Sequence, residues 1–305
     1  MMDLVATILI GAWHSLAGVS LGALAAAVAL HAGKLGAEAR AWYWIVSHAH
    51  VADRVRFRTT LGAFVSAIGA NAVLPARVGE ALRVGVVRRH VPGSNVLTIA
   101  GTIVLETAIE VVFGAAILAT VLLAGRSFGA GLGVPPLALG AIGCVALAAI
   151  VLGVAFRRRT RALLGRMATG FAIVRSPRAF VARVLSWKLV SWSFRLASVY
   201  AFLLAFHVPA APWTALVVVA AQNTAATVPL LPGNAGTQQA AIGVALAGSA
   251  STAALLGFGV GMQAATAIAD IVLGAAALLL VARRGDLSGA LATLRIGRRP
   301  RPAGA

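Results

Sequence analysis

The chain has 305 residues, of which 60% are hydrophobic and only 11% are charged, whereas a soluble domain carries about 25% charged residues. This composition excludes an ordinary water-soluble domain, because so much apolar surface cannot be hidden from water in a chain of this length. The net charge of +18 would suit a nucleic-acid-binding protein, but the basic residues cluster between long apolar runs, which excludes that class as well. The one cysteine, Cys144, excludes an intrachain disulfide, and we expect neither a metal site nor a cofactor.

Apolar segments approaching the ~20 residues that a membrane helix needs recur along the whole chain. In chain order, we predict spans from about 4 or 16 to 35, and then at 57–91, 96–124, 136–156, 184–208, 213–246 and 252–282. The second span is interrupted at Pro75 and the sixth at Pro229, Pro232 and Gly233. Proline removes a backbone donor and glycine loosens a helix, so both segments are predicted to be broken helical hairpins. Whether the hairpins are re-entrant or fully spanning stays open.

The distribution of basic residues predicts the orientation in the membrane. Of the 26 Lys and Arg residues, 24 fall within 34–58, 77–89, 157–188 and 283–301. The positive-inside rule places these stretches and the C-terminus in the cytoplasm of a bacterial or archaeal cell, around a multi-pass protein of the cytoplasmic membrane. Residues 157–183 are predicted to form a basic amphipathic helix at the membrane surface, or alternatively a solvated loop, and 283–305 form a basic tail.

The chain also resembles itself. Residues 74–79 align with 231–236, and 110–118 align with 270–278. We therefore predict an all-α membrane helix bundle forming a single domain (1–305) with two repeats, at about 57–124 and 213–282, whose hairpins cover 57–90 and 213–247. Because three spans separate the hairpins, the repeats would be inverted. Inverted halves with interrupted helices are typical of transporters that bind substrate near the middle of the membrane.

Three acidic residues, Glu106, Glu110 and Asp270, lie within predicted spans, where a charge is costly and usually has a partner. Glu106 and Glu110 are four residues apart and share one face of a helix. Arg195, near the middle of another span, is the expected counter-ion. These four residues are candidates for gating or coupling, and the alternative is a purely structural salt-bridge network.

Polar residues around the two breaks are candidates for substrate binding, because helix N-termini and arginines favour an anionic group such as phosphate. The candidates are Asn71, Arg77, Glu80, Arg83, Asn223, Asn234, Gln238 and Gln239. The alternative is a pair of proline-kinked helices whose arginines reach back to the cytoplasmic surface.

Three motifs resemble those of the lysylphosphatidylglycerol synthase transmembrane-region family, which is also called flippase-like. Residues 71–83 match its N-x-x-L-P-x-R-x-G-E-x-x-R stretch throughout. Residues 106–110 are similar to its E-R-x-x-D motif, with Thr107 in place of Arg, and 232–239 to its P-G-G-x-G-x-x-E motif, with Asn234 and Gln239 as departures. The resemblance covers about residues 16–282, and it implies a membrane domain that moves lipids between leaflets.

We therefore expect a lipid or lipid-linked-substrate translocase that moves an anionic phospholipid or a polyprenyl-phosphate-type lipid. The alternative is a non-transporting scaffold that presents lipid to a partner such as a glycosyltransferase or an aminoacyl-lipid synthase. An integral lipid-modifying enzyme is disfavoured, because the sequence has no nucleotide-binding loop, His-rich metal set or Ser/His/Asp arrangement. Expected partners are anionic membrane lipids and a lipid-modifying enzyme of the membrane or cytoplasm, but not nucleic acid. The oligomeric state stays open.

Overall fold

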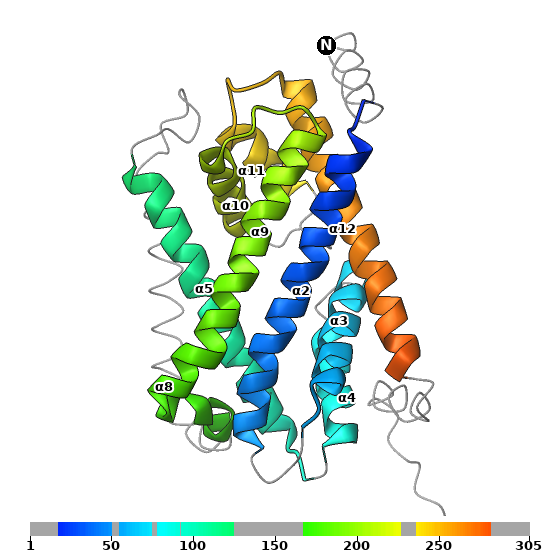
Figure 1. Cartoon of the computed structure of the whole chain (residues 1–305), viewed down its shortest axis with the longest axis vertical. Helices are drawn as coiled ribbons and strands as arrows, with labels where there is room; N and C mark the ends of the chain where they lie inside the picture. Colours follow the sequence, from blue (N-terminus) through cyan, green and yellow to red (C-terminus); the bar gives the residue numbers. More distant parts are fainter. Residues whose placement is uncertain are drawn as a thin grey trace, which may run out of the picture.

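The computed structural model describes residues 18–50, 55–74, 78–91, 93–124, 167–226 and 236–281, which form an elongated bundle of helices (Figure 1). Apart from one isolated bridge between Ala247 and Ala250, these described residues contain no β-structure. In chain order the helical elements are α2 (Leu21–Ala49), α3 (Phe57–Val73), α4 (Val78–His90), α5 (Val96–Leu123), a 3-10 segment η1 (Ala168–Arg175), α8 (Pro177–Ala179), a π-helical segment η2 (Phe180–Leu185), α9 (Ser186–Ala205), α10 (Pro212–Ala226), α11 (Thr237–Ala245) and α12 (Thr252–Val281).

Within the described part of the chain, three helices are long and apolar enough to cross a membrane. They are Val96–Val121, Pro177–Ala205 and Thr252–Val281. The second of them joins α8, η2 and α9 into one continuous helical run. The prediction of an all-helical protein with membrane-spanning helices is therefore confirmed at this level. The predicted span 136–156 and the basic tail 283–305 lie outside the described residues.

Helix α2 runs through the bundle and packs along α9, with further contacts to α3, α5 and η1. It contributes to all three clusters of buried hydrophobic residues. Ala27 lies in the cluster with α9, α10, α11 and α12, Leu35 and Trp42 in the cluster with α3 and α4, and Ile45 in the cluster with α5 and η1. This central position explains why α2 is buried over most of its lower half.

The first predicted span was too short, because α2 continues from the expected end at residue 35 to Ala49. The sequence placed Lys34 and Arg40 in a cytoplasmic connection, but both lie on the helix. Their charges have local partners: Lys34 Nζ lies 3.4 Å from Glu38 Oε1, and the Arg40 guanidinium lies about 5 Å from the rings of Tyr43, Trp44 and Phe57. A helix whose charges are paired in this way does not have to end where the apolar run ends.

Helices lie on both sides of each predicted break. α3 packs on α4 in the lower half of Figure 1, and α10 packs on α11 in the upper half. The breaks themselves, at residues 75–77 and 227–235, lie outside the described residues. Across the first one, the Asn71 side chain accepts a hydrogen bond of 2.7 Å from the backbone N–H of Gly79, so that α3 and α4 are joined close to their connection.

A close crossing holds α12 against α3. A Cβ atom added to Gly274 would lie 2.6 Å from the Cα of Gly69, and one added to Gly69 would lie 2.7 Å from the backbone oxygen of Asp270. The two backbones can approach this closely only because neither glycine carries a side chain. Small residues at such crossings are a common feature of helix packing in membranes.

The predicted amphipathic helix at 157–183 differs from the structure in its described part, which begins at residue 167. η1 is a short 3-10 segment that ends at a bend before Pro177, where the long helical run starts. Gly170 packs directly on α5, since a Cβ there would lie 2.7 Å from the amide nitrogen of Thr102, and Ile173 is fully buried. This segment is therefore not one continuous helix: Gly170 and Ile173 contact the bundle, whereas residues 174–178 are exposed.

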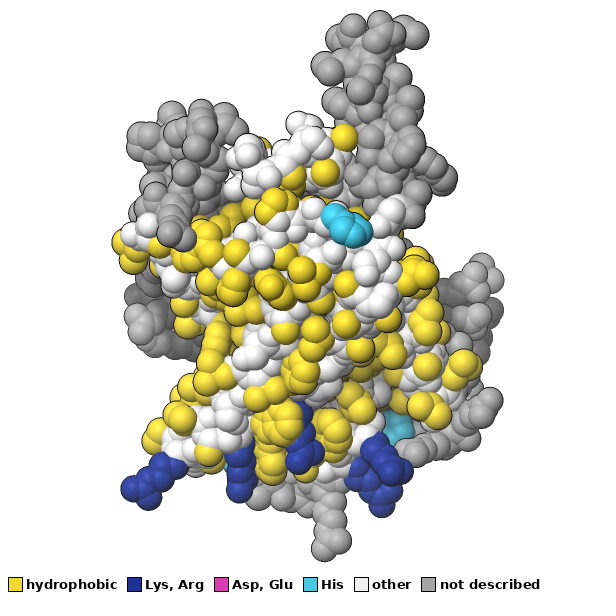
Figure 2. Space-filling view, turned by 45° about the horizontal axis from the view of Figure 1, so that its top comes forward, with side chains coloured by type: hydrophobic (Ala, Val, Ile, Leu, Met, Phe, Trp, Pro, Cys, Tyr) yellow, Lys and Arg dark blue, Asp and Glu magenta, His cyan; other side chains and the backbone are white. Residues whose placement is uncertain are grey.

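Lys and Arg side chains gather at one end of the molecule. In the space-filling view they form a row along the lower edge, below a surface that is mostly hydrophobic (Figure 2). Cationic side chains beside an apolar band are typical of helix ends that face the cytoplasmic headgroups of a membrane.

Candidate functional site

Two of the long helices turn a polar face toward the interior of the bundle. On α5 this face carries Glu106 and Glu110, and on α9 it carries Lys188, Ser191 and Arg195. Residues three or four apart lie above one another on the same side of a helix, so each set forms a polar stripe on an otherwise apolar element.

Helix α2 adds a third stripe, formed by His31, Lys34 and Glu38. Ser191 donates a hydrogen bond of 3.3 Å to Glu38 Oε1, which shows that the stripes of α2 and α9 face each other. Glu38 itself is buried and also pairs with Lys34. Glu38 was not among the residues predicted from the sequence, although its spacing of seven residues from His31 places both on one face of the helix.

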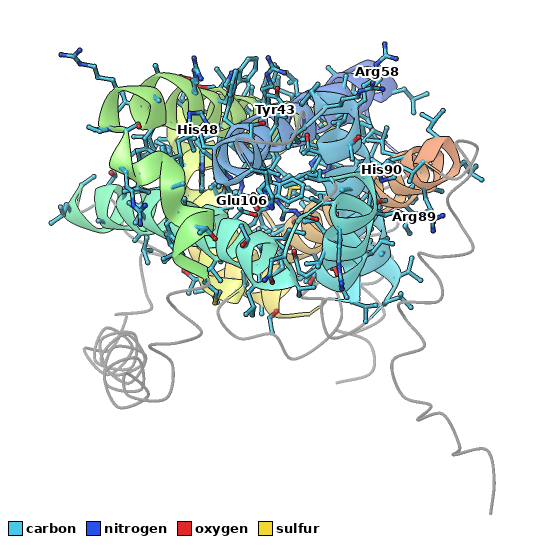
Figure 3. The ribbon with its side chains drawn as sticks, turned by 90° about the horizontal axis from the view of Figure 1, so that it is seen from below. Tyr43, His48, Arg58, Arg89, His90 and Glu106 are labelled. Atoms are coloured by element: carbon cyan, nitrogen blue, oxygen red, sulfur yellow. The ribbon has the colours of Figure 1, made fainter. Side chains whose placement is uncertain are left out.

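The lower part of the site is a buried cluster of ion pairs centred on Glu106. Lys188 Nζ lies 3.2 Å from Glu106 Oε1 and also pairs with Glu110, while Arg83 Nη2 lies 2.6 Å from Glu106 Oε2. Lys188 is fully buried and Arg83 is only 4% exposed. Seen from the lower end, Glu106 lies toward the middle of the bundle (Figure 3). Helices α4, α5 and α9 are thus joined through two cations and two carboxylates.

Arg83 is enclosed by its surroundings. Its guanidinium carbon lies 3.7 Å from the ring centroid of Trp42 and 4.6 Å from that of Phe64, and Glu80 Oε2 lies 3.6 Å from Nη1. Together with the Glu106 pair, these contacts surround the charged group with protein. Although the sequence predicted Arg83 as a phosphate-binding residue, the structure uses it to compensate Glu106.

Arg195 is not the counter-ion of the acids in α5, and this prediction was wrong. Its Nη2 donates to the side-chain oxygens of Asn223, at 2.9 Å, and Gln222, at 3.3 Å. Lys188 lies seven residues earlier on the same face of α9 and reaches Glu106 and Glu110 instead. Lys188 was missed because it stands only four residues inside the predicted span 184–208 and was grouped with the basic residues 157–188, whereas the helical run begins at Pro177 and places this lysine well inside it.

Arg195 therefore forms a second polar group, higher in the bundle, whose partners are neutral amides. The guanidinium carbon also lies 4.7 Å from the ring centroid of Trp192. Gly114 of α5 makes room for Asn223, because a Cβ at Gly114 would lie 3.2 Å from the amide nitrogen of Asn223. Among the described residues no carboxylate forms an ion pair with Arg195, which leaves its positive charge to interact with Glu110 and Glu38 only at longer range.

Asp270 has its own partner on α2. Its Oδ1 lies 2.8 Å from His31 Nε2, and both side chains are less than one-fifth exposed. The contact joins α12 to α2. Glu110 and Asp270, which the internal alignment pairs, therefore occupy different polar groups in the structure.

The residues around the second break form a smaller polar group near the start of α11. The side-chain oxygen of Gln239 accepts a hydrogen bond of 2.7 Å from the N–H of Gly236, and its amide nitrogen donates to Gln263 of α12. Gln238 is half-buried on the same helix. Two other candidates for substrate binding, Arg77 and Asn234, lie outside the described residues.

A family model described as the lysylphosphatidylglycerol synthase TM region matches residues 8–274. The chain belongs to this family. Family membership and the three apolar helices indicate a membrane protein of lipid-related function. The comparisons with curated proteins and with solved structures return no match.

Proposed function

We propose that this member of the lysylphosphatidylglycerol synthase transmembrane-region family is a translocase for a lipid or a lipid-linked substrate. The cargo would be an anionic phospholipid or a polyprenyl-phosphate-type lipid that moves between the leaflets. The observation that carries this proposal is the succession of polar groups inside the bundle, formed by facing stripes on α2, α5 and α9.

These groups succeed one another along the long axis of the bundle. Glu106 and Gly114, which contact Lys188 and Asn223 respectively, are eight residues apart on α5, or roughly 12 Å along the helix axis. Gln239 and Gln263 add a further polar contact between α11 and α12. Polar groups at membrane depth are costly and usually mark a substrate or ion pathway. Their continuity supports a route for a polar headgroup through an apolar bundle.

Arg195 is the residue that we propose to contact the anionic headgroup. Its described partners are amide oxygens, and a phosphate oxygen can replace them as acceptor of a charge-assisted hydrogen bond. Lys188 and Arg83, by contrast, already compensate carboxylates. In this proposal two groups gate the route. Glu106, Glu110 and Lys188 act between α5 and α9, and the His31–Asp270 pair acts between α2 and α12.

The proposal includes the predicted topology. The basic lower end would face the cytoplasm of a bacterial or archaeal cell, and the chain would be a multi-pass protein of the cytoplasmic membrane. The α3–α4 and α10–α11 pairs would then approach from opposite leaflets as inverted repeats. The position of α3 and α4 in the lower half of the bundle, and of α10 and α11 in the upper half, supports this arrangement.

A leaflet-exposure assay tests the proposal. The full chain is reconstituted into vesicles with phosphatidylglycerol that carries a fluorophore on its headgroup, and a membrane-impermeant quencher reports the outer-leaflet fraction. We expect the wild type to exchange the probe and Arg195→Gln to be at least about tenfold slower, since a hydrogen bond to a charged group contributes roughly 1.5–3 kcal/mol. Arg183→Gln is the matched control, because Arg183 is exposed on the same helical run and lies over Trp44.

The proposal fails if wild-type vesicles exchange the probe no faster than protein-free vesicles, or if Arg195→Gln is as fast as the wild type. A polyprenyl phosphate probe in a parallel experiment distinguishes the two classes of cargo. We do not expect the chain to be an enzyme.

The second candidate function is a non-transporting scaffold that presents lipid to a lipid-modifying enzyme. The observation in its favour is the complete pairing of Lys188 with two carboxylates, which is typical of a rigid structural lock. If the chain is such a scaffold, the purified protein should not move the labelled lipid between leaflets. A lipid-modifying enzyme should then co-purify with it in a constant ratio.

A further inference from the structure

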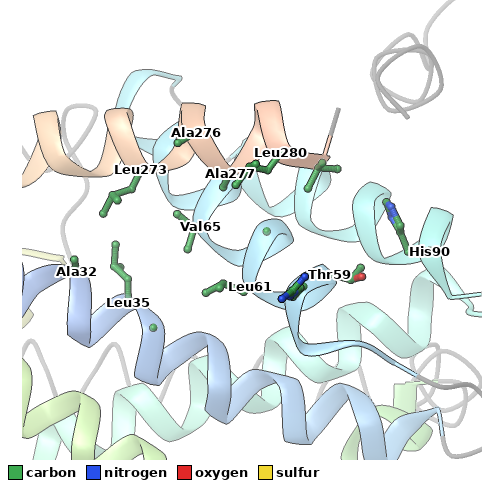
Figure 4. Close-up of a pocket in the computed structure, with 14 residues that line it drawn as sticks. Ala32, Leu35, Thr59, Leu61, Val65, His90, Leu273, Ala276, Ala277 and Leu280 are labelled. Carbon is green, nitrogen blue, oxygen red and sulfur yellow. The ribbon is translucent and has the colours of Figure 1, made fainter. Parts of the chain in front are cut away.

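A groove lies on the outside of the polar groups, between α2, α3 and α12 (Figure 4). Its volume is about 630 Å³, within the range of roughly 300–1,000 Å³ that is usual for ligand sites. Between its ends the walls are aliphatic, with Leu35 from α2, Val65 from α3, and Leu273 and Leu280 from α12. This part of the lining suits a hydrocarbon chain.

Small residues on two of the helices create the hollow. Gly36 lies on the wall formed by α2, and Ala276 and Ala277 lie on the wall formed by α12. A Cβ added to Gly36 would meet no atom within 4 Å, so this position opens onto unfilled space. The groove therefore results from the absence of side-chain volume at these positions.

The lower end of the groove is basic. Arg58, an exposed residue in the first turn of α3, and His90, at the end of α4, belong to its lining. Viewed from below, both lie with Arg89 on the side of the bundle that is next to α12 (Figure 3). Nδ1 of His90 donates a hydrogen bond of 2.8 Å to the Val86 carbonyl oxygen, which orients the ring. A cationic end on an apolar groove complements a lipid with an anionic headgroup.

Contacts between the helices that form its walls lie beyond the other end of the groove. Next to Ala32 on α2 and one turn before Leu273 on α12, His31 and Asp270 bridge the two helices at 2.8 Å. The Gly69–Gly274 crossing joins α3 to α12 at about the same level. The groove thus has one basic end and runs toward contacts that join its own helices.

We propose that this groove holds an acyl chain of a phospholipid whose anionic headgroup lies at Arg58 and His90. Burial of each methylene group contributes about 0.8 kcal/mol relative to water, but a neighbouring lipid offers the same contacts, so the preference for one lipid must come from the headgroup. The site is separate from the polar groups around Glu106 and Arg195. The inference concerns binding alone and does not depend on translocation.

Photo-crosslinking in nanodiscs tests this site. The full chain is placed in phosphatidylcholine nanodiscs with a trace of phosphatidylglycerol that carries a diazirine on one acyl chain, and the labelled peptides are mapped by mass spectrometry. We expect labelling to concentrate on the groove-lining peptides of α2, α3 and α12. A phosphatidylcholine carrying the same diazirine should label them about fivefold less, since one basic residue near an anionic surface contributes roughly this factor.

Two pairs of variants locate the site. Gly36→Leu should fill the groove and bring labelling of these peptides to background, whereas Gly22→Leu, on the same helix and equally without neighbours within 4 Å, should leave it unchanged. Arg58→Gln should abolish the preference for phosphatidylglycerol, whereas Arg56→Gln, another exposed arginine beside it, should retain the preference. Ala276→Leu fills the groove from the opposite wall and replaces Gly36→Leu if that variant does not give a monodisperse protein.

Labelling spread evenly over the lipid-facing helices would overturn the proposal. So would equal labelling by both probes, or a Gly36→Leu variant of normal stability that is labelled like the wild type. Because no step of the experiment measures exchange between leaflets, its outcome is independent of the translocation assay.

Discussion

Lys188 Nζ lies 3.2 Å from Glu106 Oε1 in a contact where the lysine side chain is fully buried and the glutamate side chain is 8% exposed. Arg83 approaches the other oxygen of the same carboxylate, so that α4, α5 and α9 converge on one acidic residue. A buried ion pair contributes little net stability when it is intact, but removal of one partner leaves an uncompensated charge. The helical arrangement around Glu106 therefore depends on all its charges being present.

Lys188→Met should lower the free energy of unfolding by about 3–5 kcal/mol, because Glu106 and Glu110 would lose the cation between them. Denaturant unfolding of the detergent-solubilised protein measures this change. Arg183→Met is the matched control, since Arg183 is exposed on the same helical run and lies over the ring of Trp44, a contact worth about 0.5–1 kcal/mol at an exposed site.

The double variant Lys188→Met with Glu106→Gln separates charge from packing. We expect it to be more stable than the sum of the two single changes predicts, because each change removes the partner that the other leaves uncompensated. Additive effects would show that the pair is not coupled in the folded protein.

Gly274→Ala should lower the free energy of unfolding by about 1–3 kcal/mol, since the new methyl group would lie 2.6 Å from Gly69 Cα and the helices would have to move apart. Gly243→Ala on α11 provides the comparison, because a Cβ there meets nothing within 4 Å. The same unfolding experiment measures both variants. If Gly274→Ala is as stable as Gly243→Ala, the α3–α12 crossing is not close.

Asn71→Ala should loosen the start of α4, because the N–H of Gly79 would lose the acceptor that it reaches at 2.7 Å. A hydrogen bond of this kind contributes about 1 kcal/mol, so hydrogen exchange of the Gly79 amide should become about fivefold faster. Asn71→Asp keeps the acceptor and should retain slow exchange. Asn95→Ala removes a comparable side-chain acceptor, that of the Leu97 N–H, and should leave Gly79 exchange unchanged.

Much of the fold could be predicted from single segments of the sequence. The apolar runs located α5 and α12 closely, and the motif at 71–83 indicated the family to which the chain belongs. The end of α2 was not predictable in this way, because Lys34 and Arg40 resemble the start of a loop until their neighbours are known. The choice between Lys188 and Arg195 as partner of the acids depended on how far the helical run extends before α9, because a run that starts at Pro177 carries Lys188 into the bundle, and the ends of helices are the least predictable part of a sequence pattern.

The sequence by itself determined that this is an α-helical membrane protein, because composition and apolar run length depend on the solvent and not on how helices meet, and its motifs resemble those of a lipid-related family. Tertiary structure decided which ionisable groups pair: Glu106 with Lys188 and Arg83, Asp270 with His31, and Arg195 with amides. It also decided where the chain leaves a groove, since Gly36 opens onto space while Gly274 is in contact with Gly69. Two glycines with the same local preferences differ only in what the rest of the fold brings next to them.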